Sequence, residues 1–379
     1  MERTANEWYP GNKILRQALK DPMRIAFIIR STLYTVPGGD SQQVLQTARM
    51  LKTLQVDVDI KLAHEKIDYD KYDLLHFFNI IRPADMLVHI KRSKKPFVVS
   101  TILIDYAVYD KQQRSGIAGK LFKLLSGGNI EYAKTLYRYL LGRDRLVSTS
   151  YLWKGQRRSI QEVLSKAACV LVQAEEEYND LVKLYSISPR FAIVKNGVDT
   201  SLFTPDDAVE RSNNKVLCVA RIEGIKNQYH LIQALNNTSY QLTLVGDAAP
   251  NQKNYYRQCK KIAAGNIVFI PHLPQQQLVN YYAAAKVHVL PSWFEVCGLS
   301  SLEAAAMGCT PVITANGYAT SYFGDAAVYC DPAQPSSILE AVKNATAAKG
   351  NGDLQKNILL NYTWQKTAEQ TLSVYKKYI

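Results

Sequence analysis

The sequence contains no apolar run long enough to cross a membrane. Its longest apolar stretches, around residues 74–81 and 169–172, fall far short of the roughly 20 residues that a transmembrane helix needs. Residues 1–23 are polar and charged, with isolated apolar side chains in place of the continuous block of a signal peptide. We therefore expect a cytoplasmic protein without a transmembrane segment.

Residues that commonly build metal or nucleophile sites are few and scattered. The cysteines have no paired spacing of the zinc type, so we expect reduced and mostly buried thiols and no metal site. The histidines likewise lack a partner spacing that marks a site, and we expect structural or exposed roles for them. These residues are Cys169, Cys218, Cys259, Cys297, Cys309 and Cys330, with His76, His89, His230, His272 and His288.

Acidic residues are scarce in one long segment. The chain has 46 basic and 33 acidic residues, a net charge of +13, and residues 111–158 hold eleven of the basic residues against two acids. Apolar residues recur at helical spacing between these cations. A basic amphipathic segment of this kind predicts attraction to an anionic membrane surface, and hence peripheral association with the inner face of the membrane. A solvated charged helix face is the alternative, and nucleic acid is a third option that no recognised motif supports.

Strand and helix patterns alternate along the chain, which indicates parallel sheets with crossover helices. A chain of 379 residues is long enough for two domains. The polar segment within 203–214 marks the boundary between them. The fold class that follows is α/β, with two Rossmann-like, doubly wound parallel-sheet domains. The expected strands are residues 24–30, 56–62, 74–78, 97–102, 169–173, 191–195, 216–220, 241–245, 267–270, 287–290, 310–314 and 327–329.

A glycine turn follows the first strand. Gly38 and Gly39 come after Pro37, and Asp40 with Gln43 predicts a capping box that opens a helix. A strand, a glycine loop and a helix in this order let the backbone approach a phosphate closely.

Two carboxylates, Glu295 and Glu303, are separated by seven residues in a loop that runs into a helix. Leu302, Ala305 and Ala306 form an apolar stripe, and Gly308 predicts the helix end. Two acceptors beside a helix N-terminus suit a ligand that carries hydroxyls at one place and phosphate at another, as a nucleotide sugar does. The alternative is that both acids only favour the helix dipole or the solvent.

Two cations follow the strand at residues 216–220. Arg221 comes directly after it and Lys226 lies five residues further on. Ligands of open α/β sheets bind just past the carboxyl ends of strands, and an Arg fork with a Lys point charge can hold a diphosphate. Two solvated side chains in a turn are the alternative.

Together these motifs resemble the retaining glycosyltransferases of the GT-B fold that are grouped as family 4, over most of the chain. The order and spacing of the motifs make the resemblance specific. They are Gly38 with Gly39, residues 196–199, Arg221 with Lys226, Gly246, Pro291 with Ser292, Glu295 with Glu303, and Gly324 with Asp325.

The resemblance implies a division of labour between two domains that face a cleft. Residues 1–203 would form an acceptor-binding domain, onto which a terminal helix at 362–379 would pack back, and residues 204–361 would bind the nucleotide-sugar donor. Arg221 and Lys226 would hold the donor diphosphate and neutralise the leaving group, while Gly38 and Gly39 close on the phosphates. Glu303 would accept hydrogen bonds from the ribose. Glu295 would sit near the transferred sugar, beside the amides of Val296, Cys297, Gly298 and Leu299.

One departure from the family pattern concerns the first domain. Many relatives carry a His followed by an Asp after a first-domain strand, whereas Ile104 and Asp105 occupy these positions here. We expect Asp105 to contact the sugar or the acceptor, with helix capping as its alternative role. Two cations and a helix N-terminus imply that no divalent metal or other cofactor is required. Asp57 and Asp59 resemble the metal-binding acid pair of the other glycosyltransferase fold. They alternate on a predicted strand, however, which is not the context of that pair.

The function expected from this resemblance is transfer of a hexose-like sugar from a nucleotide-diphosphate donor to a glycan or lipid-linked acceptor. Cell-surface polysaccharide synthesis is the expected setting, and retention of anomeric configuration is expected without an obvious covalent nucleophile. One alternative is a nucleotide-sugar epimerase of the same fold. Another is a non-catalytic protein that binds carbohydrate or membrane.

Overall fold

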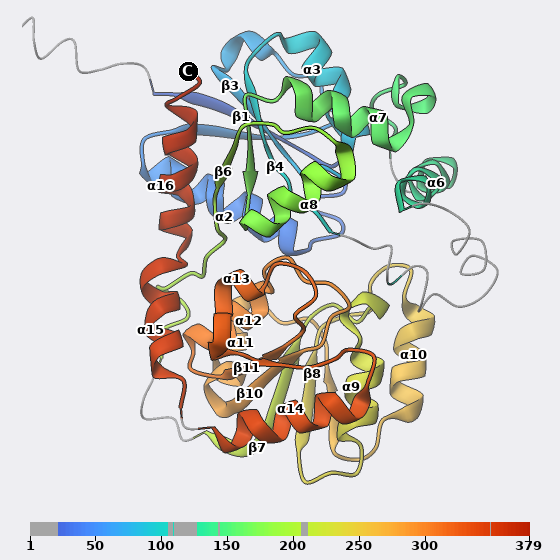
Figure 1. The fold of residues 1–379 in the computed structure, drawn as a ribbon, viewed down its shortest axis with the longest axis vertical. Coiled ribbons are helices and arrows are strands. Elements are labelled where there is room, and N and C mark those ends of the chain that lie inside the picture. The colour runs from blue at the N-terminus through green and yellow to red at the C-terminus, as the bar shows by residue number, and fades with distance from the viewer. Residues whose placement is uncertain (1–21, 105–108, 110–126, 143–144, 206–210, 349) are drawn as a thin grey trace, which may run out of the picture.

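The computed structural model describes residues 22–104, 109, 127–142, 145–205, 211–348 and 350–379. The described chain forms two parallel β-sheets, each flanked by helices, and the two resulting domains are stacked along the long axis of the molecule (Figure 1). This arrangement confirms the predicted α/β fold with two doubly wound sheets.

The N-terminal sheet has the strand order β2-β1-β3-β4-β5-β6, and all its pairs are parallel. Every residue of β3, β4 and β5 is buried, as expected for strands covered by helices on both faces. Its strands are β1 (Arg24–Ile29), β2 (Asp57–Leu62), β3 (Leu74–Phe78), β4 (Phe97–Ser100), β5 (Cys169–Val172) and β6 (Phe191–Ile193). Its helices are α2 (Gly39–Thr53), η1 (Tyr69–Lys71), η2 (Pro83–Asp85), α3 (Leu87–Ser93), α6 (Gly127–Leu140), α7 (Tyr151–Lys166) and α8 (Glu175–Tyr185).

The C-terminal sheet has the order β12-β11-β10-β7-β8-β9, again with parallel pairs. The strand order reverses between β7 and β10, and the carboxyl side of such a switch point is where open α/β sheets bind ligands. Its strands are β7 (Ser212–Val219), β8 (Gln241–Val245), β9 (Ile267–Ile270), β10 (Ala285–Leu290), β11 (Thr310–Ile313) and β12 (Val328–Tyr329). The helices that follow are η3 (Gly224–Lys226), α9 (Gln228–Leu235), α10 (Lys253–Ile262), α11 (Gln275–Ala284), α12 (Leu299–Ala306), α13 (Thr320–Phe323), η4 (Gly324–Ala326), α14 (Pro335–Ala347), α15 (Gly352–Asn361) and α16 (Trp364–Tyr375).

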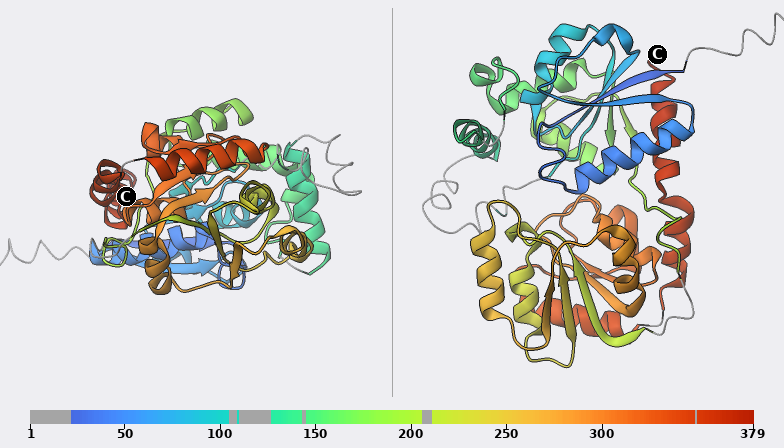
Figure 2. Two further views of the ribbon diagram at one scale, coloured as in Figure 1. Left: turned by 90° about the horizontal axis from the view of Figure 1, so that it is seen from below. Right: turned by 180° about the vertical axis from the view of Figure 1, so that it is seen from behind.

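The chain returns to the N-terminal domain at its end. Helix α15 runs beside the C-terminal domain and α16 beside the N-terminal domain, along the same side of the molecule (Figures 1 and 2). The fully buried Tyr375 of α16 places its hydroxyl 2.5 Å from His76 Nδ1 on β3. The two crossings between the domains are tied together, because the Val198 amide donates to the Tyr362 carbonyl and the Trp364 amide donates to the Val198 carbonyl.

The sequence patterns located the strands closely. Ten of the twelve predicted strands begin within one residue of the observed strand, whereas β7 begins at Ser212, inside the segment predicted as the polar boundary. All six cysteines are free and buried, as predicted. Within the described ranges, no helix is both long enough and apolar enough to span a bilayer.

Candidate functional site

The candidate site lies past the carboxyl ends of β7 and β10, at the switch point of the C-terminal sheet. Arg221 follows β7, and Lys226 ends the short helix η3. Glu295 lies in the loop after β10, and Glu303 lies within α12. The turn into α12 needs a left-handed residue, which Gly298 supplies with φ of 71°. The sheet topology therefore brings Arg221, Lys226 and Glu295 to one edge, whereas Glu303 lies about one turn inside α12.

Lys226 and Glu295 form an ion pair. Lys226 Nζ lies 2.6 Å from Glu295 Oε2, and the Ser292 hydroxyl donates to the same oxygen over 3.0 Å. Both side chains are largely covered, with exposed fractions of 22% and 13%. The pair fixes the ammonium at the switch point, where an anionic ligand can take over from the carboxylate as its partner.

Backbone hydrogen bonds fix the two loops that carry this pair. The Trp293 amide donates to the Ile225 carbonyl over 2.8 Å, which joins the loop after β10 to η3. The Glu295 amide donates to Asn316, and the Glu295 carbonyl accepts from Tyr318. The carboxylate of Glu295 is therefore held by its backbone as well as by Lys226 and Ser292.

Glu303 is held by two donors from α11. Gln275 Nε2 donates to Oε1 over 2.6 Å, and the Tyr282 hydroxyl donates to Oε2 over 2.9 Å. Burial raises the pKa of Glu303 to about 7, although both hydrogen bonds act in the opposite direction. Each carboxylate oxygen keeps a lone pair for a further donor, such as a hydroxyl of a ligand.

Arg221 is the more exposed cation of the site, with 42% of its side chain accessible, and it pairs with Glu223 at 3.0 Å. Its backbone position depends on Gly246 at the end of β8. A Cβ at Gly246 would lie 2.1 Å from the Ala220 carbonyl oxygen, and the φ of +147° is itself unfavourable for other residues. Gly246, which the sequence marked as part of the motif set, thus leaves room for the strand end that carries Arg221.

The glycine loop of the N-terminal domain faces these groups. A Cβ at Gly38 would lie 3.8 Å from the Arg221 guanidinium carbon, and one at Gly39 would lie 3.8 Å from Leu299 Cδ1. Gly38 has an extended backbone with φ of −154°, so it is not a left-handed turn that requires glycine here. The two domains therefore bring Gly38 and Gly39 against Arg221 and the start of α12.

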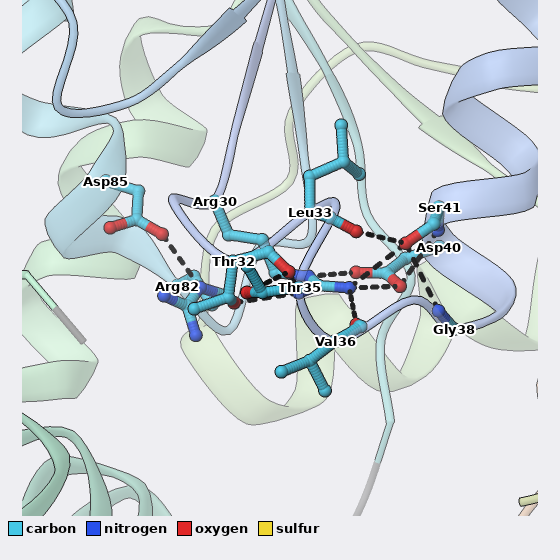
Figure 3. Close-up of polar contacts among 10 residues, drawn as sticks. All are labelled: Arg30, Thr32, Leu33, Thr35, Val36, Gly38, Asp40, Ser41, Arg82 and Asp85. Atoms are coloured by element: carbon cyan, nitrogen blue, oxygen red, sulfur yellow. Dashed lines mark hydrogen bonds and ion pairs between the residues drawn. The ribbon is translucent and has the colours of Figure 1, made fainter. Parts of the chain in front are cut away.

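An ion pair inside the N-terminal domain sets the shape of the glycine loop (Figure 3). Arg30 Nε donates to Asp40 Oδ2 over 2.6 Å, and Arg30 Nη2 also donates to the Val36 carbonyl. Burial opposes ionisation of Asp40, but the hydrogen bond and charge of Arg30 outweigh it and lower the pKa of Asp40, with a smaller contribution from Arg221.

The predicted capping box of Asp40 and Gln43 is wrong. The Asp40 carboxylate points to Arg30, because a buried guanidinium needs a counter-charge more than the helix end needs a cap. The residue that closes the turn is Ser41, whose hydroxyl accepts from the Gly38 amide over 3.2 Å. The helix begins at Gly39, one residue before the predicted cap.

Comparisons with known proteins agree with this geometry. Residues 204–358 match the family described as glycosyl transferases group 1. The D-inositol 3-phosphate glycosyltransferase of Acidothermus cellulolyticus is 23% identical over 94% of this chain and 90% of its own length. An MMP alpha-(1->4)-mannosyltransferase of Mycolicibacterium hassiacum is 26% identical over 60% of this chain and 58% of its own. The chain is a glycosyltransferase with the GT-B fold.

Solved structures share the whole two-domain architecture of this glycosyltransferase. Sucrose-phosphate synthase from Thermosynechococcus elongatus superposes with a TM-score of 0.73 at 16% identity and covers 94% of this chain and 98% of its own. HepE from Anabaena, in complex with UDP-glucose, superposes with a TM-score of 0.67 at 14% identity and covers 94% of this chain and all of its own.

The helix N-terminus of the glycosyltransferase contributes backbone groups to the site. Val296 and Cys297 are buried, and the Cys297 thiol has a pKa raised by burial, so it is not a reactive group. The four predicted residues follow Glu295 and lead into α12. Val296 and Cys297 precede the helix, Gly298 caps it and Leu299 is its first residue.

The predicted first-domain residue Asp105 lies outside the described residues. Its neighbour Ile104 is described and packs half-buried against the N-terminal core. The two acids that resemble a metal-binding pair have other partners. Asp57 pairs with Arg24, and Asp59 accepts a hydrogen bond from Tyr72.

Sequence reasoning missed Tyr282 and Gln275, the two residues that position Glu303 in this glycosyltransferase. Tyr282 belongs to the apolar pattern of α11 and is fully buried, so nothing in its spacing signals a polar role. The Arg30–Asp40 pair was missed for a related reason. The two residues flank the glycine turn, where the sequence pattern predicts only the end of a strand and the cap of a helix.

Proposed function

We propose that this glycosyltransferase moves a hexose-like sugar from a nucleotide-diphosphate donor to a glycan or lipid-linked acceptor, as a family 4 enzyme of cell-surface polysaccharide synthesis. The observation that carries the proposal is the Lys226–Glu295 ion pair past the β7/β10 switch point, with the N-terminal glycine loop against Arg221.

The diphosphate of the donor is bound by the two cations. Lys226 exchanges Glu295 for a phosphate oxygen, and the more exposed Arg221 approaches from the side of Gly38. Amides at the start of α12 and the positive end of its dipole add to the attraction. These groups neutralise the charge that develops on the leaving diphosphate, so we propose that turnover requires no divalent metal.

The two carboxylates bind opposite ends of the donor. Glu303, fixed by Tyr282 and Gln275, accepts hydrogen bonds from the ribose hydroxyls. Glu295, released from Lys226 when the diphosphate arrives, accepts from hydroxyls of the transferred sugar. Binding of the nucleotide thereby frees the carboxylate that orients the sugar.

The acceptor is bound by the N-terminal domain, and transfer retains the anomeric configuration. Asp105 is proposed to contact the sugar or acceptor from that side. The basic segment at 111–158 is proposed to bring a lipid-linked acceptor and an anionic membrane surface to the enzyme, which would then work at the inner face of the membrane.

The first test is a thermal-shift screen of UDP, GDP and ADP sugars with and without magnesium. UDP-glucose is tested first because HepE, a structural neighbour of this chain, was solved in complex with it. Stabilisation by one nucleotide series, unchanged by magnesium or a chelator, supports the proposal. Stabilisation that depends on magnesium would remove the metal-free mechanism, and no shift with any sugar nucleotide would contradict the donor class.

The second test is the stereochemistry of transfer. Proton NMR of the isolated glycoside reports the anomeric configuration of the transferred sugar directly, for comparison with that of the donor. Retention supports the proposed family 4 mechanism, whereas an inverted anomer would contradict it.

A further inference from the structure

Helix α6 and the adjoining part of α7 stand out from the N-terminal domain, on the side opposite α16 (Figures 1 and 2). We call the described residues 127–142 and 145–166 the α6–α7 lobe. The end of α7 anchors the lobe through Ile160, Val163 and Leu164 in the N-terminal core, and Ile130 of α6 and Tyr151 are each 1% exposed. It has no part in the donor site.

The lobe exposes large apolar side chains to solvent. Leu140 is 79% exposed, Trp153 72% and Tyr137 60%. Tyr137 and Leu140 are three residues apart and so share one face of α6, and Leu141 follows directly after the helix. The exposed set in the lobe is Tyr137, Tyr139, Leu140, Leu141, Leu152 and Trp153.

This concentration is unusual for the described part of the molecule. The eight other large apolar side chains exposed there are spread over the remaining chain from Tyr34 to Ile379. Single exposed apolar residues are normal on soluble proteins, whereas a gathered set marks an interaction surface.

The charge of the lobe identifies the partner. Its described residues carry seven cations and two acids, a net charge of +5. Both acids are already neutralised, Glu131 by Lys134 at 2.8 Å and Glu162 by Lys154 and Lys166. Arg157 and Arg158 of α7 are exposed and add positive charge to the lobe.

The exposed side chains belong to an ordered surface. The Tyr132 hydroxyl of α6 donates to the Leu152 carbonyl of α7 over 2.6 Å, and the rings of Tyr132 and Tyr151 lie 5.3 Å apart. Trp153 is therefore exposed directly after Leu152, whose carbonyl accepts the hydrogen bond that joins the two helices.

We propose that the α6–α7 lobe is a membrane-binding surface, with Leu140 and Trp153 entering the interface of an anionic bilayer and the surrounding arginines contacting lipid headgroups. Trp and Tyr favour the headgroup level, aliphatic side chains gain by leaving water, and cations are attracted to anionic lipid. This inference deepens the proposed function and rests on it for the acceptor, because a lobe on the acceptor-binding domain delivers a lipid-linked acceptor.

The test is flotation of the full chain with phosphatidylcholine vesicles, made with and without phosphatidylglycerol, at low and high salt. We expect binding to the anionic vesicles only, weakened by salt. The double variant Leu140→Ser with Trp153→Ser should bind about tenfold more weakly or worse, since two large apolar groups no longer leave water. Arg157→Gln with Arg158→Gln should weaken binding and its salt dependence. Leu360→Ser, which removes an exposed apolar group of α15, is the matched control and should bind like the wild type.

Tryptophan fluorescence gives a second readout of the same event. Trp293 and Trp364 are each only 5% exposed, so in a Trp8→Phe background Trp153 dominates quenching by acrylamide. Vesicles should shift its emission to the blue and protect it from the quencher.

The outcomes separate this inference from the proposed function. Lys226→Ala should lose nucleotide binding and keep vesicle binding, while the lobe variants should keep donor turnover on a soluble acceptor. If the wild-type protein turns over donor but does not bind anionic vesicles, the membrane inference alone is overturned. A wild-type dimer that the Leu140/Trp153 variant converts to monomer, with no vesicle binding, would assign the surface to a second copy and also overturn it.

Discussion

The buried Tyr282 hydroxyl donates a 2.9 Å hydrogen bond to Glu303, and this contact fixes the carboxylate that we assign to the ribose. Tyr282 is fully buried and Gln275 holds the other carboxylate oxygen, so Glu303 has one orientation. Because burial also raises the pKa of Glu303 to about 7, its ionisation changes near neutral pH.

Donor binding should therefore weaken as the pH falls through about 7, because a protonated Glu303 loses acceptor capacity for the ribose hydroxyls. The measurement is KM for the donor as a function of pH. The Tyr282→Phe variant removes a hydrogen bond that favours the carboxylate, so the midpoint of its profile should move to higher pH.

Glu303→Gln is the control for that profile. It should raise KM at all pH values and abolish the pH dependence assigned to this group. A Tyr282→Phe profile whose midpoint is unchanged or moves to lower pH would show that Tyr282 only fills space.

Gly246→Ala should damage the site from a distance. Its Cβ would lie 2.1 Å from the Ala220 carbonyl oxygen, so the strand end that carries Arg221 must move. We expect a loss of about 1–3 kcal/mol in the free energy of unfolding and a raised KM for the donor. Gly265→Ala is the matched control, since no atom lies within 4 Å of its added Cβ. Equal stability and KM for both variants would refute the role given to Gly246.

Asp40→Asn should loosen the glycine loop. It leaves the largely buried Arg30, which is 10% exposed, without its counter-charge. Breaking such a pair typically costs about 3–5 kcal/mol, and the loop beside Arg221 should lose its position. Thermal unfolding and donor KM report the two effects.

Asp57→Asn provides the comparison for that loss. Its pair with Arg24 is about half exposed, and exposed pairs contribute about 0–1 kcal/mol. A loss for Asp40→Asn as small as that for Asp57→Asn would contradict the anchoring role of the Arg30–Asp40 pair.

His76 should make the attachment of α16 sensitive to acid. Burial lowers the pKa of His76 to about 3, while in the unfolded chain this group titrates near its ordinary 6.5. The unfolded state then binds more protons between these values, so stability is lost as the pH falls below about 6.5.

The corresponding measurement is the free energy of unfolding between pH 7 and 5, taken by urea titration. The His76→Gln variant should be less stable overall and should lose a slope of up to about 1.4 kcal/mol per pH unit. The exposed His272→Gln is the matched control. An unchanged slope in His76→Gln would mean that other groups account for the acid sensitivity.

Much of the fold could be predicted because local pattern and burial coincide in this chain. Strand β5 is buried on both faces, so it appears in the sequence as a short, continuous apolar run, and β3 departs from such a run only at the buried His76. The helix after Glu295 could also be predicted, because Gly298 supplies the left-handed turn that starts α12.

The missed features are side-chain contacts between separate elements, which only the packed fold brings together. Tyr282 meets Glu303 only because α11 and α12 pack against neighbouring strands. Arg30 pairs with Asp40 because the end of β1 and the first turn of α2 bring two largely buried side chains together. Burial cannot be read from residue type alone, so a helix cap and a buried ion pair give the same sequence pattern at Asp40.

The most direct test of the central claim is calorimetric titration of the nucleoside diphosphate that the screen identifies, without sugar, into wild type, Lys226→Ala, Glu295→Gln and the distant control Lys343→Ala. The account predicts that Lys226→Ala binds at least about tenfold more weakly, since a charge-assisted contact is lost and Glu295 is left unpaired. Glu295→Gln should bind the diphosphate as well as the wild type or better, and yet turn over donor slowly. Diphosphate binding that is unchanged in Lys226→Ala would contradict the account.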